Sequence, residues 1–412
     1  MSNYITEIKV NKIFHLQDFT IPVCNSERKH LIITGKNGSG KTLLLNAIID
    51  YLDMVVRHRM LSIDKKNLRL KEDSLSIAKE KNDVLAIEAN LRDIERYKAD
   101  LQRFVTRVEV LLGDEYPLMQ EVGDRKFIIA YYADNRKPAF VEPRNPVKPD
   151  LNIAEVKQSK VDQFLNFMVD CKIQEALARN EGKTQDADYI RSWFDGFQQI
   201  LRKLFEDEEL ELNFNYKDYS FHIHNKGKVF KFTELSAGYS AALDIVTDLI
   251  LKMQEQNQVI RAYQKEGIVL IDEVETHLHL ELQRLILPIL TSIFPNIQFI
   301  ITTHSPFILN SLPNVVAFDL EHREPISDLT DYSYEALAEG YFGVKTESSE
   351  IEMRLKHMEE LINAASLTVS EQKELEEYLS DFDKMPEAVA PNVKARYYEL
   401  NRLWNAKKLG EK

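Results

Sequence analysis

The sequence predicts an α/β protein, and three observations lead to this fold class. A glycine-rich loop at residues 35–42 lies between an apolar, β-prone run and a run of helical character. Two further apolar runs, 267–271 and 297–301, each end in polar residues. Stretches of helical character separate these strand-like runs. Strands that alternate with helices favour a sheet covered by helices.

The loop is the most informative motif of the chain, because it reads Gly-Lys-Asn-Gly-Ser-Gly-Lys-Thr. Its glycines let the backbone N–H groups point at phosphate oxygens, and the helix that follows adds partial positive charge. Lys41 is expected to reach the β- and γ-phosphates, and Thr42 to place a hydroxyl on Mg²⁺. Glycine-rich turns also join strands to helices in proteins that bind nothing, but the strand before and the helix after match a phosphate-binding loop. The predicted nucleotide-binding residues here are Gly35, Lys36, Asn37, Gly38, Ser39, Gly40, Lys41 and Thr42.

Composition restricts the class of protein. The 412 residues allow two to three domains. The net charge is −13, whereas a protein that coats nucleic acid is usually basic, so DNA contact through a local patch is allowed but not supported. Cys24 and Cys171 form no metal-ligand spacing and no disulfide framework, which fits a reducing cytosol. No apolar run is long enough for a signal peptide or a membrane span, so we expect a cytoplasmic protein without membrane contact.

A helical insertion is predicted after the loop, because Lys41–Leu112 contains neither Gly nor Pro. Within it, apolar residues from Val84 to Val108 recur at alternating three- and four-residue steps, as in a heptad seam. The opposing arm is expected around Arg57–Leu70, with the turn near Lys71–Ser76. A projecting hairpin and a helix packed on the domain surface both fit this pattern.

The remaining segments give a coarse order of elements. A strand is expected at Lys126–Ala133, a helical lobe at about 150–205, and a pair of strands over Leu210–Phe232 with a turn at Asn225–Gly227. A helix follows Leu235, and the last 70 residues are helical with a break at Met385–Pro391.

Two strand ends carry further chemistry. The run at 267–271 ends in Asp272, which would hold the hydration shell of Mg²⁺, and Glu273, which would orient or deprotonate the attacking water. The run at 297–301 continues into Thr302-Thr303-His304-Ser305. A histidine at the carboxyl end of a strand in an open α/β sheet lies in the ligand crevice. We therefore predict Glu273 and His304 as catalytic residues, and Thr42 and Asp272 as the metal site.

Ser236 and Gly238 stand at the start of the helix after Leu235. Helix N-terminal N–H groups beside a serine hydroxyl form an anion site. A plain N-cap would serve the same helix without any ligand, and on local grounds the cap is favoured.

Taken in order, the phosphate loop, Leu-Ser-Ala-Gly at 235–238, Ile-Asp-Glu at 271–273 and Thr-Thr-His at 302–304 resemble the ABC-type ATPases of the SMC, RecF and OLD-like branch. The segment Glu275-Thr276-His277-Leu278-His279 looks like the Glu-x-His-Leu-His of OLD-like ATPases. The resemblance implies an ABC-type domain over 1–320, with a coiled-coil-like insertion at about 55–115, the helical lobe, and a helical C-terminal region at 321–412. It also implies that Ser236 and Gly238 meet the γ-phosphate of ATP held by the opposite subunit, in a head-to-tail dimer.

At a finer level, the run Glu234-Leu-Ser-Ala-Gly-Tyr-Ser-Ala-Ala-Leu is similar to ATPase subunits of bacterial anti-phage systems of the Septu and retron type. That similarity implies an ATP- and Mg²⁺-dependent ATPase that regulates a separate effector, an HNH-type nuclease in those systems. Two alternatives stay open, namely a DNA-repair or chromosome-structure ATPase that clamps DNA itself and a scaffold that binds ATP without appreciable hydrolysis.

The sequence departs from the family pattern at several positions. Val274 and Leu280 stand where the branch often has proline, and no clear glutamine loop follows the insertion. Arg136, after Asn135, is either a substitute for that loop or a solvated loop residue. Asp381-Phe382-Asp383 imitates the Asp-x-Asp of a Toprim nuclease, but it follows a charged helix instead of an apolar strand, so we expect a solvated helix end and no nuclease activity of this chain.

Overall fold

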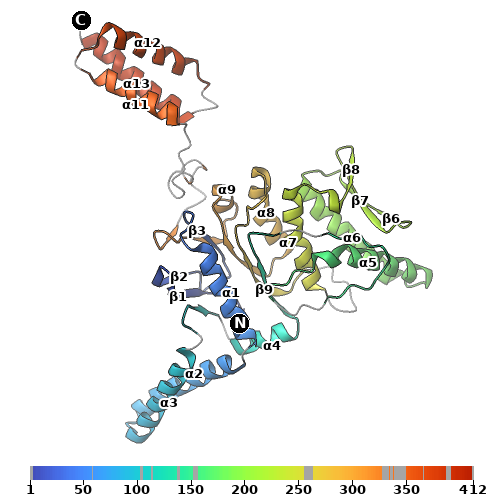
Figure 1. Ribbon diagram of the computed structural model, residues 1–412. Helices are drawn as coiled ribbons and strands as arrows, with labels where there is room; N and C mark the ends of the chain where they lie inside the picture. The colour runs from blue at the N-terminus through green and yellow to red at the C-terminus, as the bar shows by residue number, and fades with distance from the viewer. Residues whose placement is uncertain are drawn as a thin grey trace. The chain divides into compact units, whose positions relative to one another are not determined.

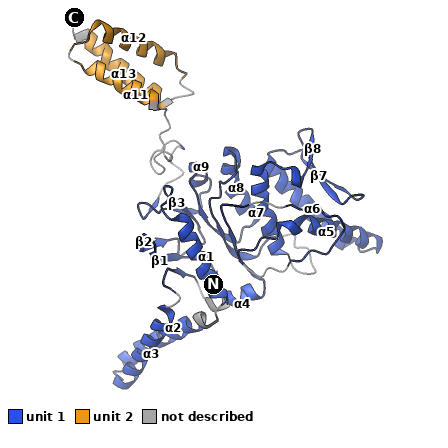
Figure 2. Ribbon diagram, viewed as in Figure 1, with its two compact units in different colours: residues 1–337 blue, residues 338–412 orange. Residues whose placement is uncertain are grey.

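The computed structural model divides the chain into two compact units, 1–337 and 338–412 (Figure 2). It describes residues 3–57, 59–102, 105–112, 115–136, 140–151, 156–254, 263–326, 334, 337, 349–364, 366–386 and 391–410. The domain boundaries given above, residue 320 among them, stay predictions.

The predicted α/β fold class is confirmed by a six-stranded central sheet with the strand order β12-β11-β3-β10-β9-β5 (Figure 1). Every neighbouring pair is parallel except β11 and β12, which run antiparallel. The inner strands are continuous apolar runs, as expected of a sheet covered on both faces. The bounds are β3 His30–Thr34, β5 Phe127–Tyr132, β9 Glu266–Ile271, β10 Ile297–Thr302, β11 Val315–Asp319 and β12 Glu324–Ile326.

A second, antiparallel sheet has the order β2-β1-β4, with β1 at Glu7–Ile13, β2 at Leu16–Pro22 and β4 at Val108–Leu111. The helix after the loop, α1 (Lys41–Arg57), packs between the two sheets, because its buried leucines and isoleucines join one core with residues of β1, β3 and β9. The short helix α4 (Glu115–Gly123) packs beside α1. This core holds the phosphate loop against the central sheet.

The insertion is a pair of antiparallel helices, α2 (Arg59–Glu80) and α3 (Val84–Gln102), which extends away from the sheets in Figure 1. The chain reverses at Lys81–Asp83, so the turn predicted at Lys71–Ser76 is wrong. Of α3, only Ile94 and Leu101 are buried, while Leu85 at the tip is 80% exposed. The hairpin therefore fits better than the packed helix. The end of the predicted seam, Val108, belongs to β4 instead of the helix.

The helical lobe consists of a short 3₁₀ turn η1 (Val161–Gln163), α5 (Phe164–Asn180) and α6 (Thr184–Phe205). Its core is aromatic, with the Trp193 ring stacked on Phe197 at 5.6 Å between centroids. The adjoining sheet has three strands instead of the predicted two, namely β6 (Glu211–Asn215), β7 (Ser220–Asn225) and β8 (Lys228–Lys231). The predicted turn at Asn225–Gly227 joins the last two.

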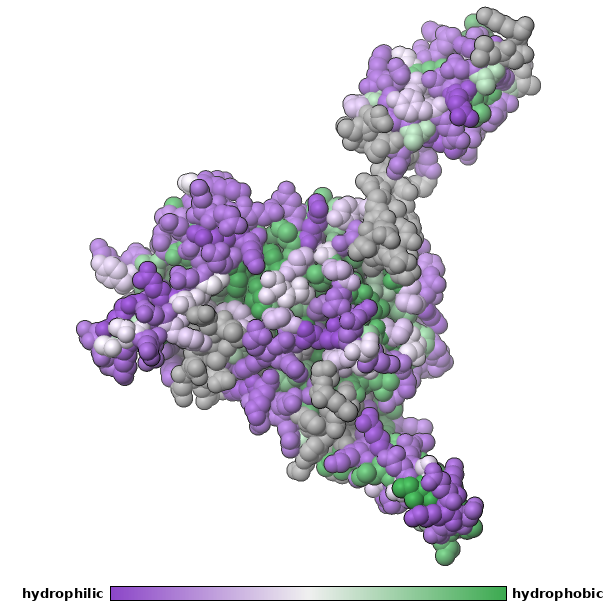
Figure 3. Space-filling view, turned by 180° about the vertical axis from the view of Figure 1, so that it is seen from behind, coloured by the Kyte–Doolittle hydropathy of each residue, from purple (hydrophilic) through white to green (hydrophobic). Residues whose placement is uncertain are grey.

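After β8, the 3₁₀ turn η2 (Phe232–Glu234) leads into α7 (Ala237–Met253), a largely buried helix that contacts β5 and α8 (Leu280–Ile293). The short helix α9 (Pro306–Leu309) follows β10. Hydrophilic side chains cover much of the face shown in Figure 3. No helix in the described part of the chain is both long and apolar enough to span a membrane.

The second unit is a bundle of α11 (Ser349–Asn363), α12 (Val369–Lys384) and α13 (Pro391–Gly410). It has a hydrophobic core of its own, with Met358, Leu375, Phe382 and Trp404 among the buried residues. Asp381 and Asp383 both lie on α12, where Asp381 pairs with Arg354 and Asp383 accepts a hydrogen bond from the Tyr397 hydroxyl. Both aspartates are exposed in the last turn of α12, as expected of a solvated helix end, and each has a partner within the bundle.

Candidate nucleotide-hydrolysis site

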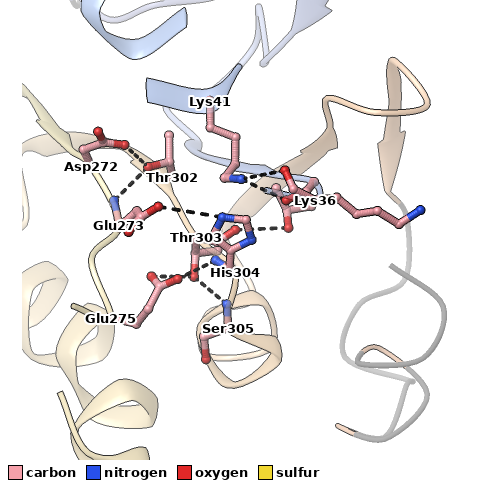
Figure 4. Close-up of polar contacts among 11 residues, drawn as sticks. Lys36, Lys41, Asp272, Glu273, Glu275, Thr302, Thr303, His304 and Ser305 are labelled. Atoms are coloured by element: carbon pink, nitrogen blue, oxygen red, sulfur yellow. Dashed lines mark hydrogen bonds and ion pairs between the residues drawn. The ribbon is translucent and has the colours of Figure 1, made fainter. Parts of the chain in front are cut away.

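The predicted motifs come together because β3, β10 and β9 are adjacent parallel strands. The phosphate loop follows β3, Thr302–His304 ends β10, and Asp272 and Glu273 follow β9. Their side chains face one another across a small region at the carboxyl edge of the sheet (Figure 4). This is the edge at which open α/β sheets bind ligands.

The phosphate loop has a backbone that requires glycine. Gly35, Gly38 and Gly40 have φ values of +137°, +83° and +98°. A Cβ atom on Gly40 would also come within 2.9 Å of the Leu16 side chain. Only glycine adopts these conformations without strain, and the curled loop they produce is the shape that surrounds phosphate.

Lys41 begins α1 and is 5% exposed. Its Nζ donates hydrogen bonds to the carbonyl oxygens of Gly35 at 2.9 Å and Lys36 at 3.2 Å. Burial lowers the pKa of the Lys41 amine, while the nearby carboxylates, Glu273 foremost, act in the opposite direction. The ammonium is thus held over the loop, where phosphate oxygens can replace the two carbonyl acceptors.

Other loop residues differ in what their side chains do. The Lys36 side chain points away from Lys41 (Figure 4). Its amine forms an ion pair with Glu321 at 2.9 Å. Ser39 has a buried hydroxyl with no hydrogen-bond partner among the described residues. Asn37 and Thr42 are exposed at the surface of the loop. Lys36 and Asn37 can therefore contribute backbone N–H groups to a ligand while their side chains face elsewhere.

Asp272 is the fully buried carboxylate of the site. Its Oδ1 accepts a hydrogen bond from Thr302 Oγ1 at 2.5 Å, whereas its Oδ2 has no partner within the described part of the chain. A buried carboxylate oxygen without a donor is costly unless a cation or water occupies its free side. Carboxylate and hydroxyl oxygens are the ligands that Mg²⁺ prefers, so Asp272 and Thr42 fit the predicted metal.

Glu273 and His304 face each other, with 3.8 Å between Glu273 Oε1 and His304 Nε2. Burial raises the pKa of Glu273, and the charge of Asp272 adds to this shift. Burial lowers the pKa of His304 to about 4, and the Lys41 cation acts in the same direction. At neutral pH the site therefore offers a carboxylate of increased basicity beside a neutral imidazole, which is the arrangement a general base requires.

Glu275 has a role that sequence reasoning did not assign. Its carboxylate accepts hydrogen bonds from Thr303 Oγ1 at 2.8 Å and from the His304 backbone N–H at 2.5 Å. It thereby joins the turn after β9 to the end of β10 (Figure 4). The Glu-x-His-Leu-His segment was visible in the sequence, but the partner strand of its first carboxylate was not.

Arg136 is buried, so the solvated-loop alternative is wrong. Its guanidinium donates to the backbone carbonyls of Ala133 at 3.0 Å and Asp272 at 2.9 Å, and more weakly to Glu273 at 3.4 Å and Val274 at 3.5 Å. Asn135 is exposed.

Ser236 and Gly238 lie at the start of α7 and are not among the residues labelled in Figure 4. Ser236 is the N-cap residue, but its side chain makes no capping hydrogen bond, and it lines a pocket of about 310 Å³ with Tyr239. Gly238 packs so closely that a Cβ atom would be 3.0 Å from the His277 carbonyl oxygen. The hydroxyl of Ser236 is thus available to a ligand or partner, and α7 lies directly against the 273–279 segment.

A family model and several known proteins are similar to this chain. Residues 126–310 match a family model described as "AAA domain, putative AbiEii toxin, Type IV TA system". A Septu protein PtuA of Bacillus mycoides (strain KBAB4) is 35% identical over 133 residues, 32% of this chain and 18% of that protein. A retron Vc95 probable ATPase of Vibrio cholerae serotype O1 biovar El Tor is 22% identical over 76% of this chain and 72% of that protein. The match to PtuA thus spans less than a fifth of that relative's length.

Among solved structures, an SMC head bound to the C-winged helix domain of ScpA is 11% identical, with a TM-score of 0.40, covering 77% of this chain and 94% of that chain. The family-model match includes Ser236, Asp272, Glu273 and His304, and begins after the phosphate loop. The curated relatives confirm the predicted resemblance, because the chain is similar to a Septu protein and to a probable ATPase of a retron.

Proposed function

We propose that this protein binds and hydrolyses ATP with Mg²⁺, and that it does so in the cytoplasm as part of an anti-phage defence system. The observation that carries the proposal is the convergence of the phosphate loop, Asp272 and Glu273 at one sheet edge, with Asp272 Oδ2 left without a donor among the described residues. The proposed role in defence is supported by the similarity to a Septu protein and to a probable ATPase of a retron.

In this mechanism Lys41 would leave the loop carbonyls and bind the β- and γ-phosphates, while Thr42 and Asp272 would hold the metal ion. When bound, Mg²⁺ neutralises phosphate charge. Glu273 accepts a proton from the attacking water or orients it, and neutral His304, next to Glu273, donates or accepts a hydrogen bond near the γ-phosphate. The loop N–H groups stabilise charge on the phosphate oxygens.

The hydrolysing form is proposed to be a head-to-tail dimer or a higher oligomer. Ser236 lies outside the loop cluster and makes no capping bond, although it stands at the N-terminus of a 17-residue helix. A free hydroxyl at such a position suits a phosphate brought by a second copy of the chain. ATP-dependent closure would then regulate a separate effector protein, for which an HNH-type nuclease is our proposal.

Nucleotide binding is tested by a matched pair of lysine variants. Lys41→Ala removes the cation held over the loop, so ATP affinity should fall at least tenfold, the equivalent of about 1.4 kcal/mol. Lys36→Ala is the control, because its amine pairs with Glu321 instead of the loop interior. Titration calorimetry that gives Lys41→Ala an affinity within twofold of wild type would refute the assignment of the loop.

The composite site is tested by mixing two inactive variants. Lys41→Ala keeps the helix of Ser236 intact, and Ser236→Arg keeps the phosphate loop intact, so one of the two sites in a mixed dimer is complete. Partial recovery of ATP turnover is expected. Absence of recovery, when mixed dimers are shown to form, would mean that the site is built within one chain.

The effector is tested by co-expression with the product of the adjacent gene. The protein should co-purify with its effector, and DNA cleavage by the complex should respond to nucleotide, whereas the chain alone should leave plasmid DNA intact with Mg²⁺ or Mn²⁺. Cleavage by the lone chain that is lost in Asp381→Asn or Asp383→Asn would overturn this division of labour.

A further inference from the structure

Arg136 is an unusual buried cation, because it binds backbone carbonyls of the turn that carries the proposed general base. Arg136 is 8% exposed, and its guanidinium donates to Asp272 O at 2.9 Å, Glu273 O at 3.4 Å and Val274 O at 3.5 Å. A fourth bond, to Ala133 O at 3.0 Å, fixes it to the end of the neighbouring strand β5. Three consecutive carbonyl groups of one turn thus meet a single planar donor.

The turn it binds is strained. Glu273 has a φ of +42°, in the left-handed region that residues with a Cβ atom rarely adopt. On the other side, the Glu273 N–H donates to Thr302 Oγ1 at 2.8 Å, and the Val274 N–H donates to Thr302 O at 3.3 Å. Thr302 therefore holds the N–H side of the turn and Arg136 the carbonyl side, and the strained conformation is kept between them.

The charge of Arg136 is retained despite its burial. Burial lowers the pKa of the guanidinium, but the carboxylates of Asp244, Glu275 and Asp272 favour its charged form. Among these carboxylates, Asp244 on α7 has the largest effect on Arg136. Burial and the neighbouring Asp248 charge raise the pKa of Asp244 itself to about 6. The charges of Arg136 and Lys252 act in the opposite direction. Arginine suits this place because its fork of five N–H donors spans several acceptors, whereas lysine is a point charge.

We propose that Arg136 is a positioning residue, which fixes the turn Asp272–Val274 by its carbonyl groups and so directs the Glu273 carboxylate toward the nucleotide. The proposal rests on the proposed function and adds to it a residue that touches neither ATP nor the reacting atoms. Arg136 acts on the rate of hydrolysis through Glu273. It leaves the phosphate loop unchanged, because none of the bonds it makes within the described part of the chain reaches that loop.

Kinetics of three variants test this role. Arg136→Met should lower kcat about 100-fold, since a displacement of about 1 Å at a catalytic group costs that much, while ATP affinity stays within twofold. Arg136→Lys should be faster than Arg136→Met but slower than wild type, because lysine restores the positive charge but not the planar set of N–H donors. Arg202→Met is the matched control, since Arg202 donates to a carbonyl, that of Leu210 at 2.9 Å, far in sequence from the turn. A kcat for Arg136→Met within threefold of wild type would overturn the proposal.

A double variant separates positioning from a general loss of structure. In the Glu273→Gln background, Arg136→Met should lower the residual single-turnover rate less than threefold, because the group it positions is already gone. An equal loss in both backgrounds would show that Arg136 does not act through Glu273.

Hydrogen exchange measures the turn without any turnover. The amides of Asp272, Glu273, Val274 and Thr276 are all bonded in the structure. These amides should exchange faster in Arg136→Met than in wild type or Arg202→Met. Unchanged exchange would refute the proposal that Arg136 fixes the turn. If wild-type protein hydrolysed no ATP, the proposed function would fail, whereas faster exchange would still show that Arg136 fixes the turn.

Discussion

At the scale of single residues, the buried side chain of His30 makes the stability of the folded protein depend on pH. It is 7% exposed on β3, and its Nδ1 accepts a hydrogen bond from the Phe299 N–H at 3.1 Å. Burial lowers the pKa of His30 to about 4, and the charge of Arg28 contributes. The imidazole must therefore be neutral in the folded protein, because a protonated Nδ1 cannot accept that bond.

The sign of the pH dependence follows from this shift. On acidification, His30 of the unfolded chain binds a proton near pH 6.5, whereas His30 of the folded chain binds one only near pH 4. The stability that neutral His30 gives is therefore complete above pH 6.5 and is lost as pH falls toward 4. The loss amounts to about 3 kcal/mol over that range. His30→Gln keeps an acceptor but cannot titrate, so urea unfolding at pH 7 and pH 4.5 should give a smaller difference for the variant. An equal difference for both proteins would contradict this account.

Individual site residues were predictable from sequence to different degrees. The phosphate loop, Asp272 and Glu273 were found because their signals are local, a loop or a strand end read from consecutive residues. The role of Arg136 was not, since its acceptors in the 272–274 turn lie 136 to 138 positions away and depend on the pairing of β5 with β9. A single sequence contains no signal for such a contact.

At the scale of elements, the hairpin α2–α3 shows the same limit. Its helical character was predicted from the lack of Gly and Pro. The turn was misplaced because Lys81–Asp83, where the chain reverses, contains neither Gly nor Pro. Asn82 takes the positive φ of this turn, at +52°. Asparagine tolerates this conformation better than most residues. The extra strand β6 was missed because β6, β7 and β8 are each only four to six residues long.

The outer part of the hairpin is expected to be dispensable for folding of the rest of its unit. Lys71 and Asp93 form an ion pair at 2.7 Å, and beyond them toward the tip only Ala78 is a buried hydrophobic residue. Replacing residues 73–91 by a four-residue Gly-Ser linker, enough to join helices about 8–10 Å apart, should leave ATP affinity and the melting temperature nearly unchanged.

The control is Leu101→Ala at the base of the hairpin, where the side chain belongs to the core around α1. Cavity formation there should cost about 2–5 kcal/mol. A shortened hairpin that is destabilised as much as Leu101→Ala would show that the tip supports the core after all.

At the scale of the whole molecule, the two units have separate hydrophobic cores, and each contains one of the two tryptophans. Trp193 lies in the core of the helical lobe and Trp404 in the bundle of the second unit. Separate cores predict separate unfolding transitions. In Trp193→Phe, tryptophan fluorescence should report only the unfolding of the bundle. In Trp404→Phe, it should report only the unfolding of the first unit. Denaturation curves that coincide for both variants would show a single cooperative unit.

The central claim is that the sheet edge formed by β3, β9 and β10 hydrolyses ATP with Glu273 as base. ATP turnover of Glu273→Gln, measured beside ATP binding, tests it most directly. The control is Glu266→Gln, which makes the same chemical change at the opposite, exposed end of β9. The account predicts that Glu273→Gln binds ATP like wild type, loses turnover about 10²–10⁴-fold and accumulates as an ATP-bound oligomer, while Glu266→Gln behaves as wild type. Unchanged turnover in Glu273→Gln would contradict it.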